Sequence, residues 1–160
     1  MTVMVIYGTD SGSTKTIASR IAKKIGGKAL DIKSASTADL EGSDLLILGS
    51  PTYGEGDLQC DWEDNLQTLK SANIASKKVA LFGTGDQASY PDSFVNALGT
   101  LYDHVVEQGA VVVGFTETDG YSFKKSTAVR DGKFVGLVLD QDGQASMTDG
   151  RITSWISNLV

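Results

Sequence analysis

A polar loop near the amino terminus has the residue types of an anion-binding site. The segment Gly8-Thr9-Asp10-Ser11-Gly12-Ser13-Thr14 carries four hydroxyl side chains within six residues, and a helical pattern follows it directly. Backbone N–H groups at a helix N-terminus attract negative charge, and neighbouring hydroxyls add hydrogen bonds. A helix cap needs only one hydroxyl, so we interpret this loop as a site for a terminal phosphate. An ordinary hydroxyl-rich helix cap is the alternative.

Two further polar loops carry one tyrosine each. Tyr53 lies in the loop 50–60 and Tyr90 in the loop 83–92, and neither belongs to an apolar stripe. Two aromatic side chains at the ends of neighbouring strands would form two walls for a flat ring. The alternative is that each tyrosine packs on its own loop.

Two common nucleotide-binding motifs fit these loops poorly. A Walker A motif requires glycine immediately before its lysine, but Lys15 follows Thr14. The segment 83–88 (Gly-Thr-Gly-Asp-Gln-Ala) superficially matches a dinucleotide fingerprint, yet Pro91 disfavours the helix that would have to begin there. Neither a triphosphate site nor a dinucleotide site is therefore indicated.

The hydrophobic pattern places the three loops at one edge of an α/β sheet. Short apolar runs alternate with amphipathic helical stretches. Strands are expected at 3–7, 28–32, 44–49, 77–83 and 111–115, the fifth resuming at 134–139, and helices at 14–25, at 61–71, from Asp92 as N-cap to 109, and from 148. This predicts one domain, residues 1–160, with a doubly wound five-stranded parallel sheet and helices on both faces. Such sheets bind ligands beyond the carboxyl ends of their strands, where the three loops lie.

Composition narrows the class of protein. The 160-residue chain has 14 basic and 20 acidic residues, a net charge of −6, which disfavours nucleic acid and suits a basic partner. Cys60 and His104 are single residues of their types, which excludes an internal disulfide and a cysteine- or histidine-rich metal centre. The apolar amino-terminal run lacks a basic segment and is short, so it indicates a strand rather than a signal peptide or membrane span. We expect a soluble cytoplasmic protein.

The loops resemble those of long-chain flavodoxins. Residues 9–14 are similar to the flavodoxin phosphate loop, Thr-x-Thr-Gly-x-Thr. Residues 50–59 (Ser-Pro-Thr-Tyr-Gly-Glu-Gly-Asp-Leu-Gln), continued by Asp61-Trp62, resemble the first flavin loop, and residues 82–87 with Tyr90 resemble the second. Residues 119–121 and 132–137 resemble the extra loop that interrupts the fifth strand in the long-chain type. The four motifs occur in the right order and span essentially the whole chain.

The resemblance implies a protein that binds flavin mononucleotide (FMN) non-covalently and carries single electrons between partner proteins. It implies that the phosphate is held by Thr9, Ser11, Gly12, Ser13 and Thr14, with Asp10 beside them. It implies that Tyr53 and Tyr90 sandwich the isoalloxazine ring and that Thr52, Gly85 and Asp86 bond its polar edge. The other cofactor-binding residues implied by these loops are Ser50, Pro51, Gly54, Glu55, Gly56 and Thr84.

Two expectations concern how the chain tunes the flavin. In the family a backbone carbonyl turns toward flavin N5 on reduction, and we expect the Gly54–Glu55 peptide to do so, because glycine permits the positive φ required. A flexible turn is the alternative. A group of acidic side chains is expected to disfavour the reduced, anionic ring, with a merely solvated rim as the alternative. These residues are Glu55, Asp57, Asp61, Asp86 and Asp92.

A flavodoxin-like quinone or nitro reductase is the alternative function. Such an enzyme needs a substrate pocket over the ring, whereas tyrosines on both faces leave only the ring edge open, which favours a carrier. A receiver domain is excluded, because the first strand ends in Tyr7-Gly8-Thr9 rather than in paired acids. The expected partners of this monomer are redox proteins with basic docking surfaces, such as an NADPH-dependent flavodoxin/ferredoxin reductase and a low-potential acceptor.

Overall fold

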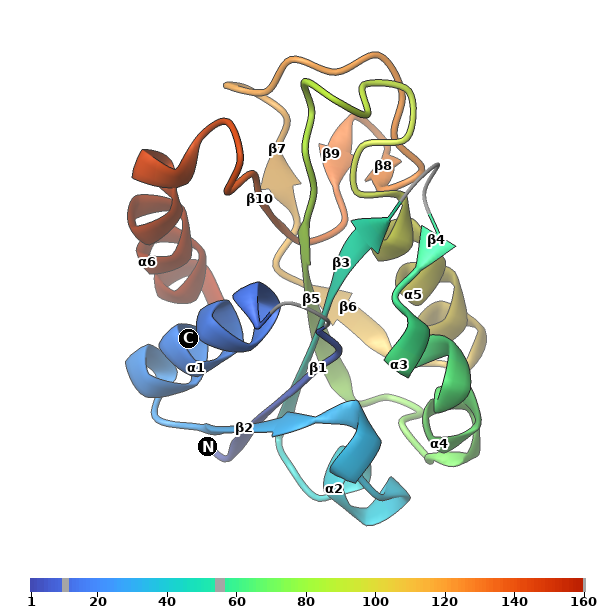
Figure 1. The fold of residues 1–160 in the computed structure, drawn as a ribbon. Helices are drawn as coiled ribbons and strands as arrows, with labels where there is room; N and C mark the ends of the chain where they lie inside the picture. Colours follow the sequence, from blue (N-terminus) through green and yellow to red (C-terminus); the bar gives the residue numbers. More distant parts are fainter. Residues whose placement is uncertain (10–11, 54–56, 160) are drawn as a thin grey trace.

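A parallel sheet runs through the centre of the computed structural model, which describes residues 1–9, 12–53 and 57–159 (Figure 1). Its strand order is β2-β1-β3-β5-β10, and β6 also pairs with β5. The strands are β1 (Val3–Tyr7), β2 (Lys28–Asp31), β3 (Leu45–Tyr53), β5 (Lys78–Thr84), β6 (Val111–Val113) and β10 (Leu137–Leu139).

The fifth position of this sheet is shared by two strands. β6 pairs with the first half of β5, and β10 pairs with its second half, both in parallel. The predicted doubly wound sheet with an interrupted fifth strand is therefore confirmed.

Helices cover both faces of the sheet (Figure 1). α1 (Ser13–Ile25) and α6 (Thr148–Leu159) pack on one face. The other face is covered by α2 (Thr37–Glu41), α3 (Cys60–Asp64), α4 (Leu66–Ser71) and α5 (Asn96–Glu107). Two single 3-10 turns, η1 (Ile32–Ser34) and η2 (Ala145–Met147), complete the helical segments described.

Burial on both faces explains why the central strands are continuously apolar. The β3 residues 45–48 (Leu-Leu-Ile-Leu) are all buried, and their side chains alternate between the two core clusters. On α1, Ile17 and Ile21 lie one turn apart and are fully buried against the sheet. Each such side chain contributes about 1.5–3 kcal/mol to folding.

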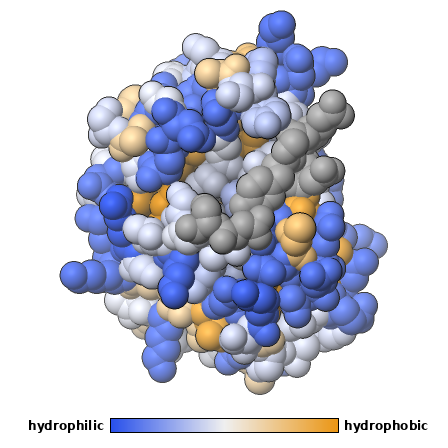
Figure 2. Space-filling model, viewed as in Figure 1, coloured by the Kyte–Doolittle hydropathy of each residue, from blue (hydrophilic) through white to orange (hydrophobic). Residues whose placement is uncertain are grey.

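The surface has the opposite character. Hydrophilic residues cover most of the face seen in Figure 2, and hydrophobic ones form only small separate patches. In the described part of the chain, none of the helices combines the length and the apolar character that crossing a membrane would require.

The segment between β6 and β10 contains regular structure that the sequence did not reveal. We expected residues 116–133 to be irregular, but β7 (Thr116–Glu117), β8 (Val129–Arg130) and β9 (Lys133–Phe134) form a small antiparallel sheet. Aromatic side chains anchor this insert. The ring centroids of Phe123 and Phe134 lie 5.4 Å apart, and both rings pack on Phe94 of the main body. The strands are too short for a periodic signal.

Two predicted helices differ from the observed ones. The helix expected over 61–71 is divided at Asn65, whose backbone leaves helical geometry, into α3 and α4. The helix expected from Asp92 begins only at Asn96, so Asp92 is not its cap. Backbone N–H groups of Lys124 and Lys125 in the insert donate to the Pro91 carbonyl, which holds residues 91–95 in turns.

Two short elements were not expected. α2 is a single five-residue helix with a capping box between Ser36 and Asp39. β4 (Asp57–Leu58) pairs antiparallel with the end of β3. Both are too short for the sequence pattern to predict.

Gly136 provides a test of how closely the insert joins the main sheet. A Cβ atom at Gly136 would overlap the carbonyl oxygen of Leu81, whereas one at Gly150 in α6 would meet nothing within 4 Å. We expect Gly136→Ala to lower the free energy of unfolding by about 1–3 kcal/mol, because backbone must shift. Gly150→Ala, the matched control, should raise it by up to about 1 kcal/mol, as alanine does in helices. Urea denaturation measures both, and equal small effects would contradict the packing described.

Tyr121 of the insert gives a prediction for alkaline pH. Its hydroxyl donates to the Val138 carbonyl at 2.6 Å, and burial raises the pKa of Tyr121 to about 12, partly opposed by Arg151 above the ring. The folded state therefore keeps a proton that the unfolded state loses near pH 10, so this contribution to stability is complete below pH 10 and falls between pH 10 and 12. Tyr121→Phe should be less stable than the wild type at neutral pH, and the difference should shrink across this window. Denaturant unfolding at several pH values measures this difference in unfolding free energy. A difference that stays constant across the window would contradict the prediction.

Candidate functional site

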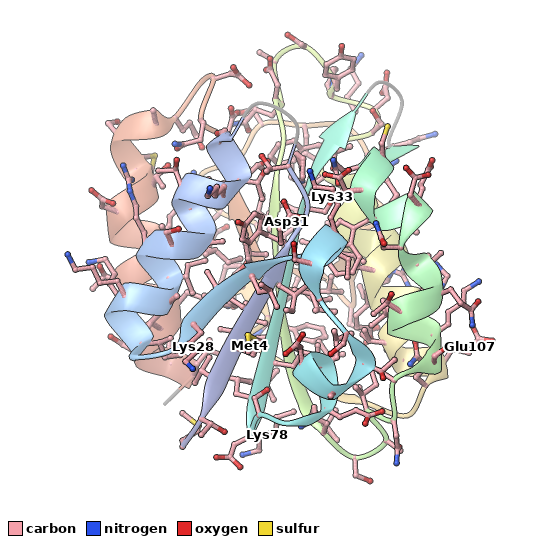
Figure 3. All side chains as sticks on the ribbon, turned by 60° about the horizontal axis from the view of Figure 1, so that its bottom comes forward. Met4, Lys28, Asp31, Lys33, Lys78 and Glu107 are labelled. Carbon is pink, nitrogen blue, oxygen red and sulfur yellow. The ribbon has the colours of Figure 1, made fainter. Side chains whose placement is uncertain are left out.

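A cavity of about 300 Å³ opens at the carboxyl edge of the parallel sheet. Segments from four places in the sequence meet there: the start of α1, the end of β3, the loop after β5 and the loop after β10. Its lining residues are Ser13, Thr14, Pro51, Thr52, Thr84, Gly85, Asp86, Tyr90, Gln141 and Asp142. The amino-terminal edge of the sheet, where Lys28 and Lys78 begin β2 and β5, is the edge turned forward in Figure 3.

The start of α1 forms one end of this cavity. Gly12 is the N-cap residue and has a φ of 89°, a left-handed conformation that favours glycine. Among residues 1–9, 12–53 and 57–159, no side chain caps the helix, and its first turn contains no acidic residue. The Gly12 N–H donates to Thr9 Oγ1 at 3.0 Å, which links the end of the first strand's extension to the start of the helix. The first N–H groups of a helix have no partner within it, so this end is suited to a phosphate.

The end of β3 provides one wall. Pro51 and Thr52 line the cavity, and Thr52 Oγ1 accepts the Ala97 N–H at 3.3 Å, which ties this wall to the start of α5. Ser50 does not line it: its side chain is fully buried, and its hydroxyl donates to the Pro51 carbonyl at 2.8 Å.

The loop after β5 provides the opposite wall. The Gly85 N–H donates to the Leu139 carbonyl at 3.1 Å, and the Asp86 carbonyl accepts the Tyr90 N–H at 2.9 Å. Asp86 Oδ1 also accepts the Ser89 N–H at 3.1 Å. Tyr90 is 45% exposed, which leaves its ring at the mouth of the cavity, available to a ligand.

The sequence analysis did not identify the residues that follow β10. Gln141 and Asp142 line the cavity, and the carboxylates of Asp86, Asp140 and Asp142 lie within 4.8 Å of one another. The topology could have identified these residues, because the carboxyl end of the fifth strand lies at the same edge of the sheet as the other loops. Acidic groups at this end would disfavour negative charge on a bound ring.

Several predicted site residues lie outside the described residues: Asp10, Ser11, Gly54, Glu55 and Gly56. The side chains of Tyr53 and Asp57 also fall outside, although their backbones belong to β3 and β4. Three expectations therefore stay predictions: the phosphate contacts of Asp10 and Ser11, the enclosure of the flavin ring between two tyrosines, and the rotation of the Gly54–Glu55 peptide.

Other singled-out residues have clear places. Asp61 lies 3.9 Å from Lys33 Nζ, which partly offsets its charge. Trp62 is fully buried, and its Nε1 donates to the Gly49 carbonyl at 2.8 Å, so it packs the core rather than facing the cavity. Trp155 is likewise buried. Cys60 is exposed.

The fold and the cavity together define the class of protein. A sheet of order β2-β1-β3-β5-β10, with a helix start and an exposed tyrosine at its carboxyl edge, is a flavodoxin-like α/β architecture suited to a phosphorylated ligand with a flat ring.

Comparisons with known proteins identify the family. The flavodoxin family model matches residues 5–155. The chain is 43% identical to a flavodoxin of Synechococcus elongatus, over 97% of this chain and 94% of the relative, and 43% identical to a flavodoxin of Helicobacter pylori at the same coverage. A crystal structure of Fusobacterium nucleatum flavodoxin bound to FMN superposes with a TM-score of 0.93 at 35% identity, covering 99% of this chain and 96% of that one. The chain belongs to the flavodoxin family.

Proposed function

We propose that this protein is an FMN-containing, low-potential carrier of single electrons between redox partner proteins. The observation that carries the proposal is the cavity at the carboxyl edge, which joins the start of α1 to the exposed ring of Tyr90. Flavodoxins are electron-transfer proteins rather than enzymes, and the Fusobacterium relative of similar structure is bound to FMN.

The described residues fit the phosphate end of FMN. Ser13 and Thr14 line the cavity at the start of α1, where the helix dipole and the first N–H groups of the helix favour an anion. Gly12 permits the left-handed cap that aims these groups outward. We propose that Thr9 through Thr14, including Asp10 and Ser11, surround the phosphate.

The described residues also fit the ring end. Pro51 and Thr52 on one side and Gly85 and Asp86 on the other leave a polar slot, with Tyr90 at its mouth. A Cβ atom at Gly85 would lie 3.0 Å from the Val95 side chain and 3.2 Å from the Phe94 ring, so a larger residue here would crowd these two side chains. We propose that Tyr53 and Tyr90 cover the two ring faces, with Ser50, Gly54, Glu55, Gly56 and Thr84 completing the two loops.

Bound FMN supplies a ring that accepts and releases electrons one at a time. The chain binds that ring, shields it from solvent and places charged side chains around it. Asp86, Asp140 and Asp142 form a negative cluster beside the slot, which makes an additional negative charge on the ring unfavourable. This arrangement favours a strongly reducing carrier.

The finer aspects of partnership are also proposals. The protein acts as one monomeric domain in the cytoplasm, and it exchanges electrons with an NADPH-dependent flavodoxin/ferredoxin reductase and a low-potential acceptor. Three exposed acids support docking by basic partner surfaces: Glu63 and Asp64 at the end of α3, and Asp92 in the loop after β5. Salt should then slow electron transfer to such a partner.

Stepwise anaerobic reduction tests the proposed function. The protein loaded with FMN should take up two electrons in separate steps, seen as a long-wavelength absorption band that rises with the first and disappears with the second. Direct bleaching without this band, or NADPH-driven turnover of a quinone without a partner protein, would favour the reductase instead. Failure to bind FMN would refute the proposal.

Ser13 tests the phosphate end. Ser13→Ala removes an exposed hydroxyl at the cavity, and we expect the dissociation constant for FMN to rise about fivefold, the effect of one lost hydrogen bond. Riboflavin, which lacks the phosphate, should bind both proteins equally. Ser19→Ala, an exposed change further along α1, is the control. Isothermal titration measures all three, and an equal loss for riboflavin would place the phosphate elsewhere.

Asp86 tests the electrostatic contribution. A carboxylate about 10 Å from the ring, at an effective dielectric constant near 20, opposes an added electron by roughly 1.7 kcal/mol, or about 70 mV. Asp86→Asn should therefore raise the potential of the second one-electron step by tens of millivolts. Glu107→Gln is the control, since Glu107 extends outward from α5, away from the cavity (Figure 3). Spectroelectrochemistry measures the potentials. Equal values for Asp86→Asn and the wild type would mean that the acidic side chains form a solvated rim without effect on the flavin.

A further inference from the structure

Gln87 is a buried polar side chain in the middle of the loop 84–90, and both ends of its amide are engaged. Its Nε2 donates to Asp140 Oδ2 at 2.7 Å. Its Oε1 accepts the backbone N–H of Ser122 at 2.5 Å. The amide thus joins three segments that are distant in sequence: the loop after β5, the end of β10 and the insert.

Asp140 and Ser122 fix which way this amide points. The carboxylate is fully buried, and it also accepts the Gln87 N–H at 3.3 Å and the Gly143 N–H at 2.8 Å. The Ser122 N–H can be accepted only by the amide oxygen, so the amide nitrogen must face Asp140. Hydrogen bonds to a buried charge are the strong ones, and losing one leaves the charge poorly satisfied.

Two residues proposed to face the flavin flank Gln87 in the loop, one directly before it and one three residues after it. Asp86 precedes it and lines the cavity, and the Asp86 carbonyl accepts the Tyr90 N–H, which closes the turn containing Gln87. Moving the Gln87 backbone would therefore move both Asp86 and Tyr90.

We infer that Gln87 is a positioning residue: through Asp140 and Ser122 it holds the loop 84–90 in the conformation that presents Asp86 and Tyr90 to FMN. The inference rests on the proposed function. It assigns the insert a role at the cofactor site, because the acceptor end of Gln87 is held by the backbone of Ser122.

Gln144 provides a matched comparison. Its Nε2 donates to the Gly120 carbonyl at 2.8 Å, so it also fastens the insert to the body, but it lies outside the loop 84–90. A role in fastening the insert alone would make the two glutamines equivalent. A positioning role makes only Gln87 important for the cofactor.

The first experiment compares Gln87→Leu with Gln144→Leu, each loaded with FMN. We expect Gln87→Leu to raise the dissociation constant for FMN about tenfold and to shift the one-electron potentials. Gln144→Leu should stay within about twofold of the wild type, with unchanged potentials. Equal effects of the two variants, or no effect of Gln87→Leu, would overturn the inference.

Gln87→Glu adds a pH signature that a loss of packing would not give. A protonated carboxyl at this position can donate to Asp140, whereas an ionised one faces the charges of Asp140, Asp86 and Asp142. The remaining charged or titratable neighbours keep their state between pH 5 and 9, since the pKa of Tyr121 is about 12 and Arg151 stays protonated.

The dissociation constant of Gln87→Glu for FMN should therefore approach the wild-type value at low pH and rise relative to it as the pH increases. A ratio of variant to wild type that does not change with pH would overturn the inference. Measuring the ratio removes any pH dependence that both proteins share.

Amide hydrogen exchange in the FMN-free full chain separates the network from the cofactor. The Ser122 amide should exchange faster in Gln87→Leu than in the wild type or in Gln144→Leu. Unchanged Ser122 exchange would overturn the hydrogen-bond network itself. Failure of the wild type to bind FMN would overturn the proposed function, and the positioning role with it, whatever the exchange result.

Discussion

The structure depends on the requirement that a parallel sheet be covered on both faces. Each crossover between parallel strands must return along the sheet through a helix, so every strand leads out at the same edge. β1, β3 and β5 lie side by side in register, so the loops that follow them all begin at this one edge of the sheet. Hydrophobic burial of the strands thus brings the chemistry of distant loops together, and the cavity residues need only be suited to the ligand.

The strongly periodic parts of this arrangement were predictable from the sequence. Buried runs such as residues 45–48 and the spacing of Ile17 and Ile21 predicted strand and helix positions, and the α/β alternation predicted the sheet. Some departures, such as α2 and β4, are elements too short for a periodic pattern, and two others depend on tertiary contacts. The late start of α5 follows from insert N–H groups donating to Pro91, and the small antiparallel sheet follows from Phe123 and Phe134 packing on Phe94.

The same distinction applies to the candidate site. Loops with concentrated hydroxyls, glycines and tyrosines pointed to Ser13, Thr14, Thr52 and Tyr90, all of which line the cavity. Composition did not reveal Asp142 or Gln141, because a short acidic turn is also typical of an ordinary surface loop. Ser50 belongs to the motif yet is buried behind the wall, which shows that a motif residue can support a site without lining it.

Charge is the remaining problem for an acidic protein that is to hold a phosphate. A net charge of −6 opposes anion binding at long range, but salt limits such repulsion to a Debye length of about 8 Å. Within that distance, the start of α1 offers N–H groups that have no partner within the helix, and its first turn contains no acidic residue. The carboxylates of Asp86, Asp140 and Asp142 gather instead on the loops after β5 and β10. One end of the cavity can therefore bind a permanent anion while the other disfavours a new one, and this separation allows a single small site both to retain a phosphorylated cofactor and to make its ring a strong reductant.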